Sequence, residues 1–135
     1  NNELISVASF GKSRYNKNIE YELIRYTNKS AYSIIGGFSK LLKQFELEVN
    51  FKSLLSYKKL DFGTSNFYEK LGFKKEKRLA PNFYWVVDGI KFNRQNFQKH
   101  KLKDNIENKT AVQYMIDKGY YRCYDSGSDV FILSN

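Results

Sequence analysis

The chain has 135 residues, a length typical of one domain that buries about two-thirds of the surface exposed by its unfolded form. A hydrophobic content of 41% argues against a disordered tail, no apolar run approaches the ~20 residues of a membrane span, and the single cysteine, Cys123, excludes an internal disulfide. The formal net charge of +9 fits either an ordinary solvated surface or an electrostatic footprint for a polyanion.

Residues 3–10 and 21–26 predict two strands joined by a hairpin-like loop. Apolar residues fall on both faces of the first strand, so we expect it to be covered on both sides. The loop carries three cations and one tyrosine: Lys12, Arg14, Lys17 and Tyr15. Such a loop can hold a nucleic-acid backbone and stack on a base, or it can be an ordinary solvated turn.

Residues 38–46 predict a helix that begins at a glycine turn. Its apolar residues recur at the i, i+3, i+4 and i+7 positions of one helix face: Phe38, Leu41, Leu42 and Phe45. Gly36 and Gly37 stand directly before this helix, with Ser39 in its first turn. Glycines at that place let a backbone or a ligand approach the free N–H groups and the positive dipole end, which suits a phosphate.

The next segment predicts a buried strand at residues 53–57 and then a second helix. Thr64 or Ser65 can cap this helix, and Gly72 fits the C′ position, where a left-handed conformation is needed. The inner face of the helix is formed by three residues: Phe67, Tyr68 and Leu71.

The charged run KKEKR (74–78) interrupts the apolar pattern, which resumes as an aromatic strand at residues 82–87. Alternation puts Phe83, Trp85 and Val87 on one face of this strand, so we expect at least half of its aromatic residues to be buried. The dipeptide at 88–89, Asp-Gly, predicts the turn that follows.

From residue 90 the chain becomes strongly basic. Its cationic and imidazole side chains surround Phe92 and Phe97, and they are Lys91, Arg94, Lys99, His100, Lys101 and Lys103. A helix would align Lys91, Arg94, Gln98 and Lys101 on one side. After this segment, the capping box of Thr110 and Gln113 predicts a helix that ends at Gly119, and residues 120–133 predict a hairpin with its turn at 125–128.

The stretch NFYEKLGF (66–73), placed after a short strand, resembles the second signature of the GNAT acetyltransferase fold. The resemblance implies an α/β domain with a GNAT-like central mixed sheet flanked by helices, here with a basic helical segment and a C-terminal hairpin. It puts the glycine turn at 36–37 where that fold cradles the pyrophosphate of acetyl-CoA. It also puts Tyr68 where many of these enzymes have a general acid, although Tyr68 equally fits a buried helix face. Ser33 and Phe38 depart from the usual Arg/Gln-x-x-Gly-x-Gly/Ala pattern of the cofactor loop.

A second resemblance covers nearly the whole chain, in order. Its motifs are YELIRYTNK (21–29), GG-x-SKLLK (36–43), NFYEKLGF (66–73), R-x-x-F-x-KHKL (94–102) and GYYR-x-YD-x-G (119–127). They resemble the C-terminal region of phage-encoded, Hef-like homing endonucleases and related phage proteins. In such proteins the nuclease motif generally lies in a separate N-terminal part. We therefore expect residues 1–135 to form a single GNAT-like domain of a longer protein, in the cytoplasm of a phage-infected bacterial host.

The candidate catalytic groups are sparse. His100 is the only histidine, and in a basic segment it suits a phosphate contact or a surface position better than a catalytic base or a zinc ligand. A metal-dependent nuclease needs clustered carboxylates. Here the candidate aspartates are scattered along the chain and suit turns: Asp61, Asp88, Asp125 and Asp129. We therefore expect no metal and no nuclease centre within these residues.

The sequence thus predicts a DNA-associated, backbone-binding domain without a cofactor, without membrane contact and without catalysis of its own, in a parent protein of endonuclease type. The residues expected to bind nucleic acid are Lys12, Arg14, Lys17, Lys91, Arg94, Lys99, His100, Lys101 and Arg122. An alternative is an acetyl-CoA-dependent N-acetyltransferase that uses Gly36, Gly37 and Ser39 for phosphate binding and Tyr68 as the acid. A third possibility is a protein-interaction domain on an inactive GNAT fold.

Overall fold

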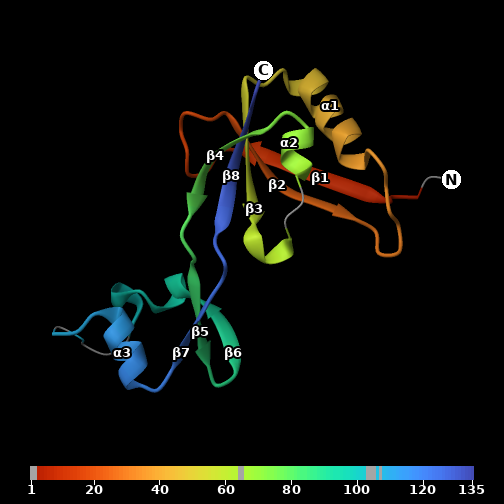
Figure 1. The fold of residues 1–135 in the computed structure, drawn as a ribbon. Helices are drawn as coiled ribbons and strands as arrows, with labels where there is room; N and C mark the ends of the chain where they lie inside the picture. Colours follow the sequence, from red (N-terminus) through yellow and green to blue (C-terminus); the bar gives the residue numbers. More distant parts are fainter. Residues whose placement is uncertain (1–2, 64–65, 103–105, 107) are drawn as a thin grey trace. The chain divides into compact units, whose positions relative to one another are not determined.

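The computed structural model describes residues 3–63, 66–102, 106 and 108–135, and it is a mixed α/β structure with two sheets. The chain forms two compact units: unit 1 contains the chain up to Leu79 together with Ser128–Asn135, and unit 2 is Ala80–Gly127. The chain can be followed through each unit by its colour in Figure 1. Compact units can belong to one domain, so the expectation of a single domain stays a prediction.

Unit 1 is built on a five-stranded sheet with the order β1-β2-β3-β8-β4 (Figure 1). The strands are β1 (Ser6–Lys12), β2 (Tyr21–Asn28), β3 (Ser53–Lys59), β4 (Lys74–Leu79) and β8 (Ser128–Ser134). The neighbours β2 and β3 run parallel, but they pair only at Tyr21–Leu54 and Glu22–Leu55, whereas the other neighbours are antiparallel. The sheet is therefore mixed, as predicted.

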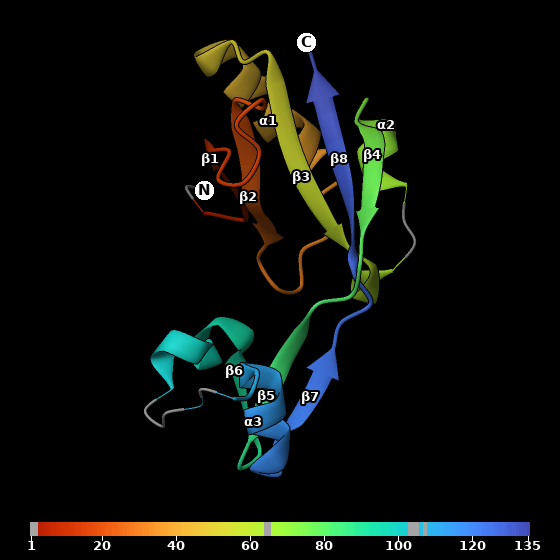
Figure 2. The ribbon, with the colours of Figure 1, turned by 90° about the vertical axis from the view of Figure 1, so that its left-hand side faces the viewer.

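Two helices lie on the same side of this sheet, behind it in Figure 2. They are α1 (Gly37–Val49) and α2 (Phe67–Lys70), and a 3-10 turn, η1 (Leu60–Phe62), follows β3. The helix predicted at 38–46 and the strand predicted at 53–57 are confirmed. The second predicted helix is only one turn long, and its suggested caps, Thr64 and Ser65, lie outside the described residues.

Gly72 ends α2 in the way that the sequence predicts. Its φ angle is 86°, which is in the left-handed region that glycine adopts without strain. The N–H groups of Gly72 and Phe73 donate to the carbonyls of Glu69 and Tyr68, which satisfies the free carbonyls at the end of the helix.

The core of unit 1 lies between the sheet and the two helices. Its buried members are Leu23, Phe38, Leu42, Phe51, Leu54, Phe73 and Phe131. Phe38 and Leu42 belong to the predicted apolar stripe of α1, so the periodicity of that helix correctly identifies its buried face.

The expectation that the first strand is covered on both sides is wrong. β1 is an edge strand, and only one of its faces packs on the core, through Ala8 and Phe10. Val7, on the other face, is exposed. Both helices lie on one side of the sheet, so the apolar residues on the other face of β1 have no helix to cover them.

The charged run at 74–78 forms a strand, although in the sequence it interrupts the apolar pattern and predicts none. It makes up most of β4, which pairs with β8 at the other edge of the sheet and has every residue exposed. The ladder is irregular between Lys75 and Lys77. Lysine-rich edge strands are common because charge discourages pairing with other chains.

Unit 2 is built on a three-stranded antiparallel sheet with the order β6-β5-β7. Its elements are β5 (Phe83–Val87), β6 (Ile90–Asn93), η2 (Arg94–Phe97), η3 (Lys99–Lys101), α3 (Ala111–Asp117) and β7 (Tyr121–Tyr124). The 3-10 turns and α3 lie on one side of this sheet (Figures 1 and 2). Trp85, Met115 and Ile106 are the buried apolar residues described in unit 2.

Local signals in unit 2 are confirmed at two places. The Oγ1 atom of Thr110 accepts from the N–H of Gln113, so Thr110 caps α3 as predicted. Asp88 and Gly89 both have positive φ angles, 50° and 78°, in the turn that joins β5 to β6.

Two predictions for this part of the chain are wrong. The basic segment is not an α-helix. It forms the strand β6, which follows β5 after a turn, and then the two 3-10 turns η2 and η3. Residues 120–133 are not a hairpin, because β7 pairs with β5 in unit 2 whereas β8 pairs with β3 and β4 in unit 1. Asp125, expected in the hairpin turn, accepts instead from the backbone N–H of Asn82 and of Gly127.

Among the described residues, no helix has the length and apolar character required to cross a membrane.

Candidate nucleic-acid interface

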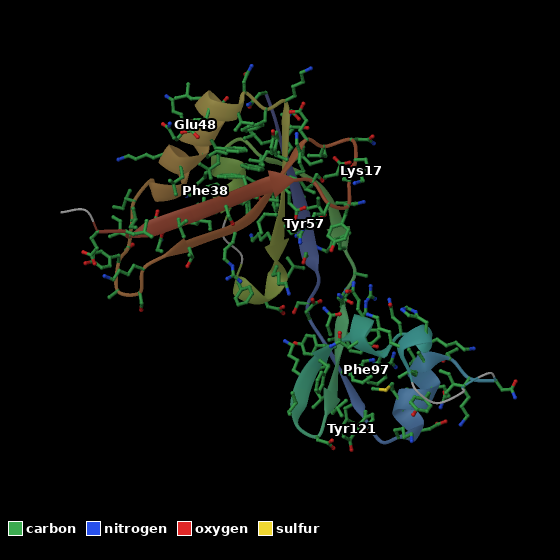
Figure 3. The ribbon with its side chains drawn as sticks, turned by 180° about the vertical axis from the view of Figure 1, so that it is seen from behind. Lys17, Phe38, Glu48, Tyr57, Phe97 and Tyr121 are labelled. Atoms are coloured by element: carbon green, nitrogen blue, oxygen red, sulfur yellow. The ribbon has the colours of Figure 1, made fainter. Side chains whose placement is uncertain are left out.

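The predicted nucleic-acid-binding residues fall into two sets, one in each unit. Lys12, Arg14 and Lys17 lie on β1 and on the loop between β1 and β2 in unit 1, where Figure 3 labels Lys17. The other predicted residues, Lys91, Arg94, Lys99, His100, Lys101 and Arg122, lie in unit 2.

In unit 1, Arg14 forms an ion pair with a buried carboxylate. Its Nη2 atom lies 2.9 Å from Oε1 of Glu22, whose side chain is only 2% exposed, and its backbone N–H points to the other oxygen. The hydrogen bond that Arg14 donates to Glu22 raises the pKa of Arg14 above its ordinary value. Because Glu22 neutralises this guanidinium, Arg14 is a weaker candidate for phosphate binding than the sequence predicts.

Glu22 was not among the predicted site residues. A glutamate between Tyr21 and Leu23 in a strand normally faces water, and its burial depends on the preceding loop, which local patterns do not reveal. Ser13 is also buried, and its Oγ has no hydrogen-bond partner among the described residues. Burial is the main cause that raises the pKa of Tyr57, and the nearby negative charge of Glu22 raises this pKa further.

In unit 2, three of the predicted cations lie against aromatic rings. The Nζ atom of Lys91 lies 3.4 Å from the ring centroid of Tyr84. The guanidinium carbons of Arg94 and Arg122 lie 5.9 Å and 5.5 Å from the ring centroid of Phe83. These are distances at which a cation is attracted to the face of a ring.

None of these three cations forms an ion pair with a carboxylate in the described part of the chain. Rings hold their positions without neutralising their charge. The sequence predicts Phe83 only as a strand residue, whereas Tyr84 is also a candidate for stacking on an unpaired base. The alternation that buries Trp85 already puts Tyr84 on the opposite face, which is the signal that could have identified it.

The basic residues between 91 and 101 do not form the row that a continuous helix would give. Lys99, His100 and Lys101 are exposed on η3, whereas Lys91 belongs to β6 and Arg94 to η2. The row required a continuous helix, which is absent between residues 90 and 102. Lys103, at the end of the same segment, lies outside the described residues.

The aromatic residues of unit 2 divide into core and surface. Trp85 is 2% exposed, so it cannot stack on a base. Tyr120 is half-buried, whereas Tyr121 and Tyr124 are exposed on β7. Figure 3 labels Tyr121 on this strand and Phe97 on η2.

The glycine turn before α1 is explained by packing within the chain. A Cβ atom on Gly37 would lie 2.7 Å from Cγ2 of Ile34 and 3.0 Å from the hydroxyl of Tyr26. Gly36 has a φ angle of 69°, and its carbonyl accepts from the hydroxyl of Ser39 at 2.9 Å. These three residues, suggested as a phosphate cradle, therefore have intramolecular reasons for their identity.

The side chain of Phe38 is buried beside this turn. Its ring packs against Tyr26 and Phe67 with centroid distances of 5.0 Å and 5.3 Å. Phe38, one of the two residues that depart from the GNAT pattern, therefore packs between β2, α1 and α2 in the core of unit 1.

Tyr68, the suggested general acid, has the contacts of a core residue. Its ring stacks on Phe131 at a centroid distance of 5.0 Å, and its hydroxyl accepts from the hydroxyl of the buried Ser56 at 2.8 Å. These contacts account for the tyrosine without catalysis, and the catalytic role stays a prediction.

The expectation that Asp129 is a turn residue is wrong. It lies in β8, is buried, and accepts hydrogen bonds from Lys75 and Arg78 of β4, each at 2.7 Å. Hydrogen bonds from Arg78 and then Lys75 hold the pKa of Asp129 well below its usual range. Within the described ranges, no three His, Cys, Asp or Glu side chains lie close enough together to hold a metal ion.

No protein-family model matches this chain, and no curated protein matches it significantly. The feature that stands out in unit 2 is the set of Lys91, Arg94 and Arg122, which we call the ring-held cations. In unit 1, Lys12 has a similar contact, with its Nζ atom 4.2 Å from the ring centroid of Tyr21.

Proposed function

We propose that this chain is a DNA-associated domain that binds the nucleic-acid backbone as part of a phage mobile-element or endonuclease-type protein. Its role is to provide affinity and position, while bond breaking belongs to another part of the parent protein. The observation that carries the proposal is the placement of the ring-held cations. Each of them contacts an aromatic ring, and none has an acidic partner in the described chain.

The charge pattern favours a phosphate partner. Cations whose role is structural are paired with carboxylates here, as Arg14 is with Glu22 and Arg78 with Asp129. The ring-held cations differ because their contacts leave a full positive charge available. A polyanion gains from such charges through the release of its condensed counterions.

We also propose that unit 1 has a GNAT-like fold. Three features support this assignment: the mixed sheet, the parallel neighbours β2 and β3 with α1 between them in the chain, and the short α2 before β4. The acetyl-CoA alternative has weaker support. Gly37 is explained by Ile34, and the buried ring of Phe38 stands where a small residue is usual.

The proposal is tested by the salt dependence of duplex binding. In the 135-residue chain, Lys91→Gln, Arg94→Gln and Arg122→Gln are combined in one variant, and Kd for a mixed-sequence duplex is measured across a salt series. Each lost phosphate contact lowers the slope of log affinity against log salt by about 0.9. Arg94 and Arg122 share the ring of Phe83, whereas Lys91 lies on the other face of the sheet, so we expect a decrease of at least about 2. The sequence preference stays unchanged, because phosphate contacts do not read bases.

A second triple variant controls for net charge. It replaces with glutamine three exposed lysines of unit 1 that form no ion pair in the described chain: Lys40, Lys43 and Lys70. Its overall charge equals that of the first variant, but we expect its slope to stay within about 1 of the parent value. Equal decreases in both variants, or no decrease in the first with its circular dichroism spectrum preserved, would contradict the proposal.

A further inference from the structure

One face of the sheet of unit 2 is covered by none of the helices described in that unit. The side chains on this face are those opposite to Trp85 by strand alternation and register, and we call them the open face: Tyr84, Val86, Lys91, Asn93, Tyr121 and Cys123. The contact of Phe92 with Phe97 of η2 identifies the other face as the covered one. Figures 1 and 2 agree, because they show α3 and the 3-10 turns on a single side of this sheet.

The open face combines one free aromatic ring with one fixed cation. Tyr121 is 75% exposed. Val86 lies between Tyr121 and Lys91, because it pairs with both across the sheet. Neighbouring strands are about 4.8 Å apart, so the backbones that carry Tyr121 and Lys91 are about 10 Å apart on this face.

Lys91 has a preferred position on this surface, because its ammonium lies 3.4 Å from the ring centroid of Tyr84 and is attracted to the face of that ring. It therefore marks a place for one phosphate beside an exposed ring. A duplex can use this phosphate contact, but its bases are stacked on one another and hide their faces. Only an unpaired base can stack on Tyr121.

We infer that the open face of unit 2 binds single-stranded DNA, with an unpaired base stacked on Tyr121 and a neighbouring phosphate on Lys91. This inference rests on the proposed function and extends it from duplex backbone to unpaired strand. Stacking of one base on an aromatic side chain changes affinity by roughly 5- to 150-fold. Tyr121 therefore contributes to single-strand affinity by that factor and leaves duplex affinity unchanged.

The first experiment measures Kd of the 135-residue chain for a DNA strand of about 12 nucleotides and for the corresponding duplex. We expect Tyr121→Ala to weaken strand binding by roughly 5- to 150-fold and duplex binding by less than about twofold. Tyr121→Phe keeps the ring and retains strand affinity. The salt slope stays the same in both variants, because no charge is removed.

Tyr32 offers a control, because it is also exposed but lies in unit 1, away from the predicted nucleic-acid-binding residues. We expect Tyr32→Ala to leave strand affinity within about twofold of the parent value. If Tyr32→Ala weakens strand binding as much as Tyr121→Ala does, stacking is not specific to the open face and the inference fails.

Cys123 provides a second readout without any substitution. It is the only cysteine, it is exposed, and it lies two residues from Tyr121 on the same face. We expect saturating single strand to slow its reaction with a thiol reagent by at least about tenfold, whereas duplex has a smaller effect. An unchanged rate with bound single strand would overturn the inference.

The two proposals fail in different ways. If Tyr121→Ala lowers strand and duplex affinity equally, or lowers neither, the single-strand inference is wrong while the salt slope of the ring-held cations still tests backbone binding. If the parent chain binds neither nucleic acid, the proposed function itself is wrong.

Discussion

Replacing Gly37 by alanine distinguishes a packing role from a phosphate-binding role at the start of α1. The added Cβ would lie 2.7 Å from Cγ2 of Ile34, well inside the 3.5–4.0 Å that two carbon atoms prefer. Overpacking of this kind costs about 1–3 kcal/mol. Alanine returns up to about 1 kcal/mol through its better helix propensity, so we expect a net loss of about 1–2 kcal/mol in the free energy of unfolding.

A double-mutant cycle with Ile34→Ala locates this cost. That substitution removes Cγ2, the atom closest to the added Cβ, so most of the penalty should disappear from the double variant. We expect a coupling energy of at least about 1 kcal/mol between the two positions. Gly36→Ala is a useful comparison, because its added Cβ meets only the Ser39 hydroxyl at 3.5 Å and the cost comes from a φ angle of 69°.

The assay for these variants has to report unit 1. The only tryptophan, Trp85, belongs to unit 2, so its fluorescence serves as a check that unit 2 remains folded. Urea unfolding followed by far-ultraviolet circular dichroism, together with amide hydrogen exchange of α1, reports unit 1. A Gly37→Ala variant of unchanged stability that no longer binds acetyl-CoA would refute the packing explanation and favour the cofactor alternative.

Two further predictions concern the core and the β4–β8 pair. Tyr68→Phe removes the acceptor of a buried hydroxyl and should cost about 1 kcal/mol in urea unfolding, with duplex affinity unchanged; a loss of duplex affinity would contradict the core role. Because the pKa of Asp129 is depressed in the folded state, its contribution to stability is full above the unfolded value of about 3.9 and is lost as the pH falls below it. The stability difference between the parent and Asp129→Asn should therefore shrink between pH 7 and pH 3, and a constant difference would contradict the Arg78 contact.

The elements that the sequence predicts correctly are those specified by nearby residues. α1 has its apolar stripe within four turns, α3 has Thr110 and Gln113 three positions apart, and Gly72 lies directly after α2. Signals of this kind do not depend on the rest of the fold. They therefore survive in the structure with small shifts of the boundaries.

The elements that the sequence does not predict depend on distant partners. β4 has no apolar pattern of its own and is a strand because it pairs with β8, on the far side of unit 2 in the chain. The predicted hairpin at 120–133 fails for the same reason, since β7 and β8 find partners in different sheets.

The candidate site shows the same division. Lys91, Arg94 and Arg122 are visible in the sequence as cations. Arg94 and Arg122 contact the same ring because the pairing of β5 with β7 brings Arg122 beside Phe83 across about forty residues of chain, whereas Lys91 contacts Tyr84. The burial of Glu22 is also partly non-local, because it depends on the pairing of Glu22 with Leu55 of β3 as well as on the loop before β2.

The place where unit 2 leaves and rejoins unit 1 has a consequence for chain entropy. Leu79 and Ser128 are paired in the β4–β8 ladder, so the whole of residues 80–127 occupies the position of a hairpin loop. If that loop were unfolded, closing it would cost about 3 kcal/mol more than closing a two-residue turn. The reciprocal hydrogen bonds between Asn82 and Asp125 hold the ends of the folded insertion together and remove most of this cost. If unit 2 unfolded, the pairing of β8 with β4 would therefore become weaker, because it would have to close a long loop of free chain.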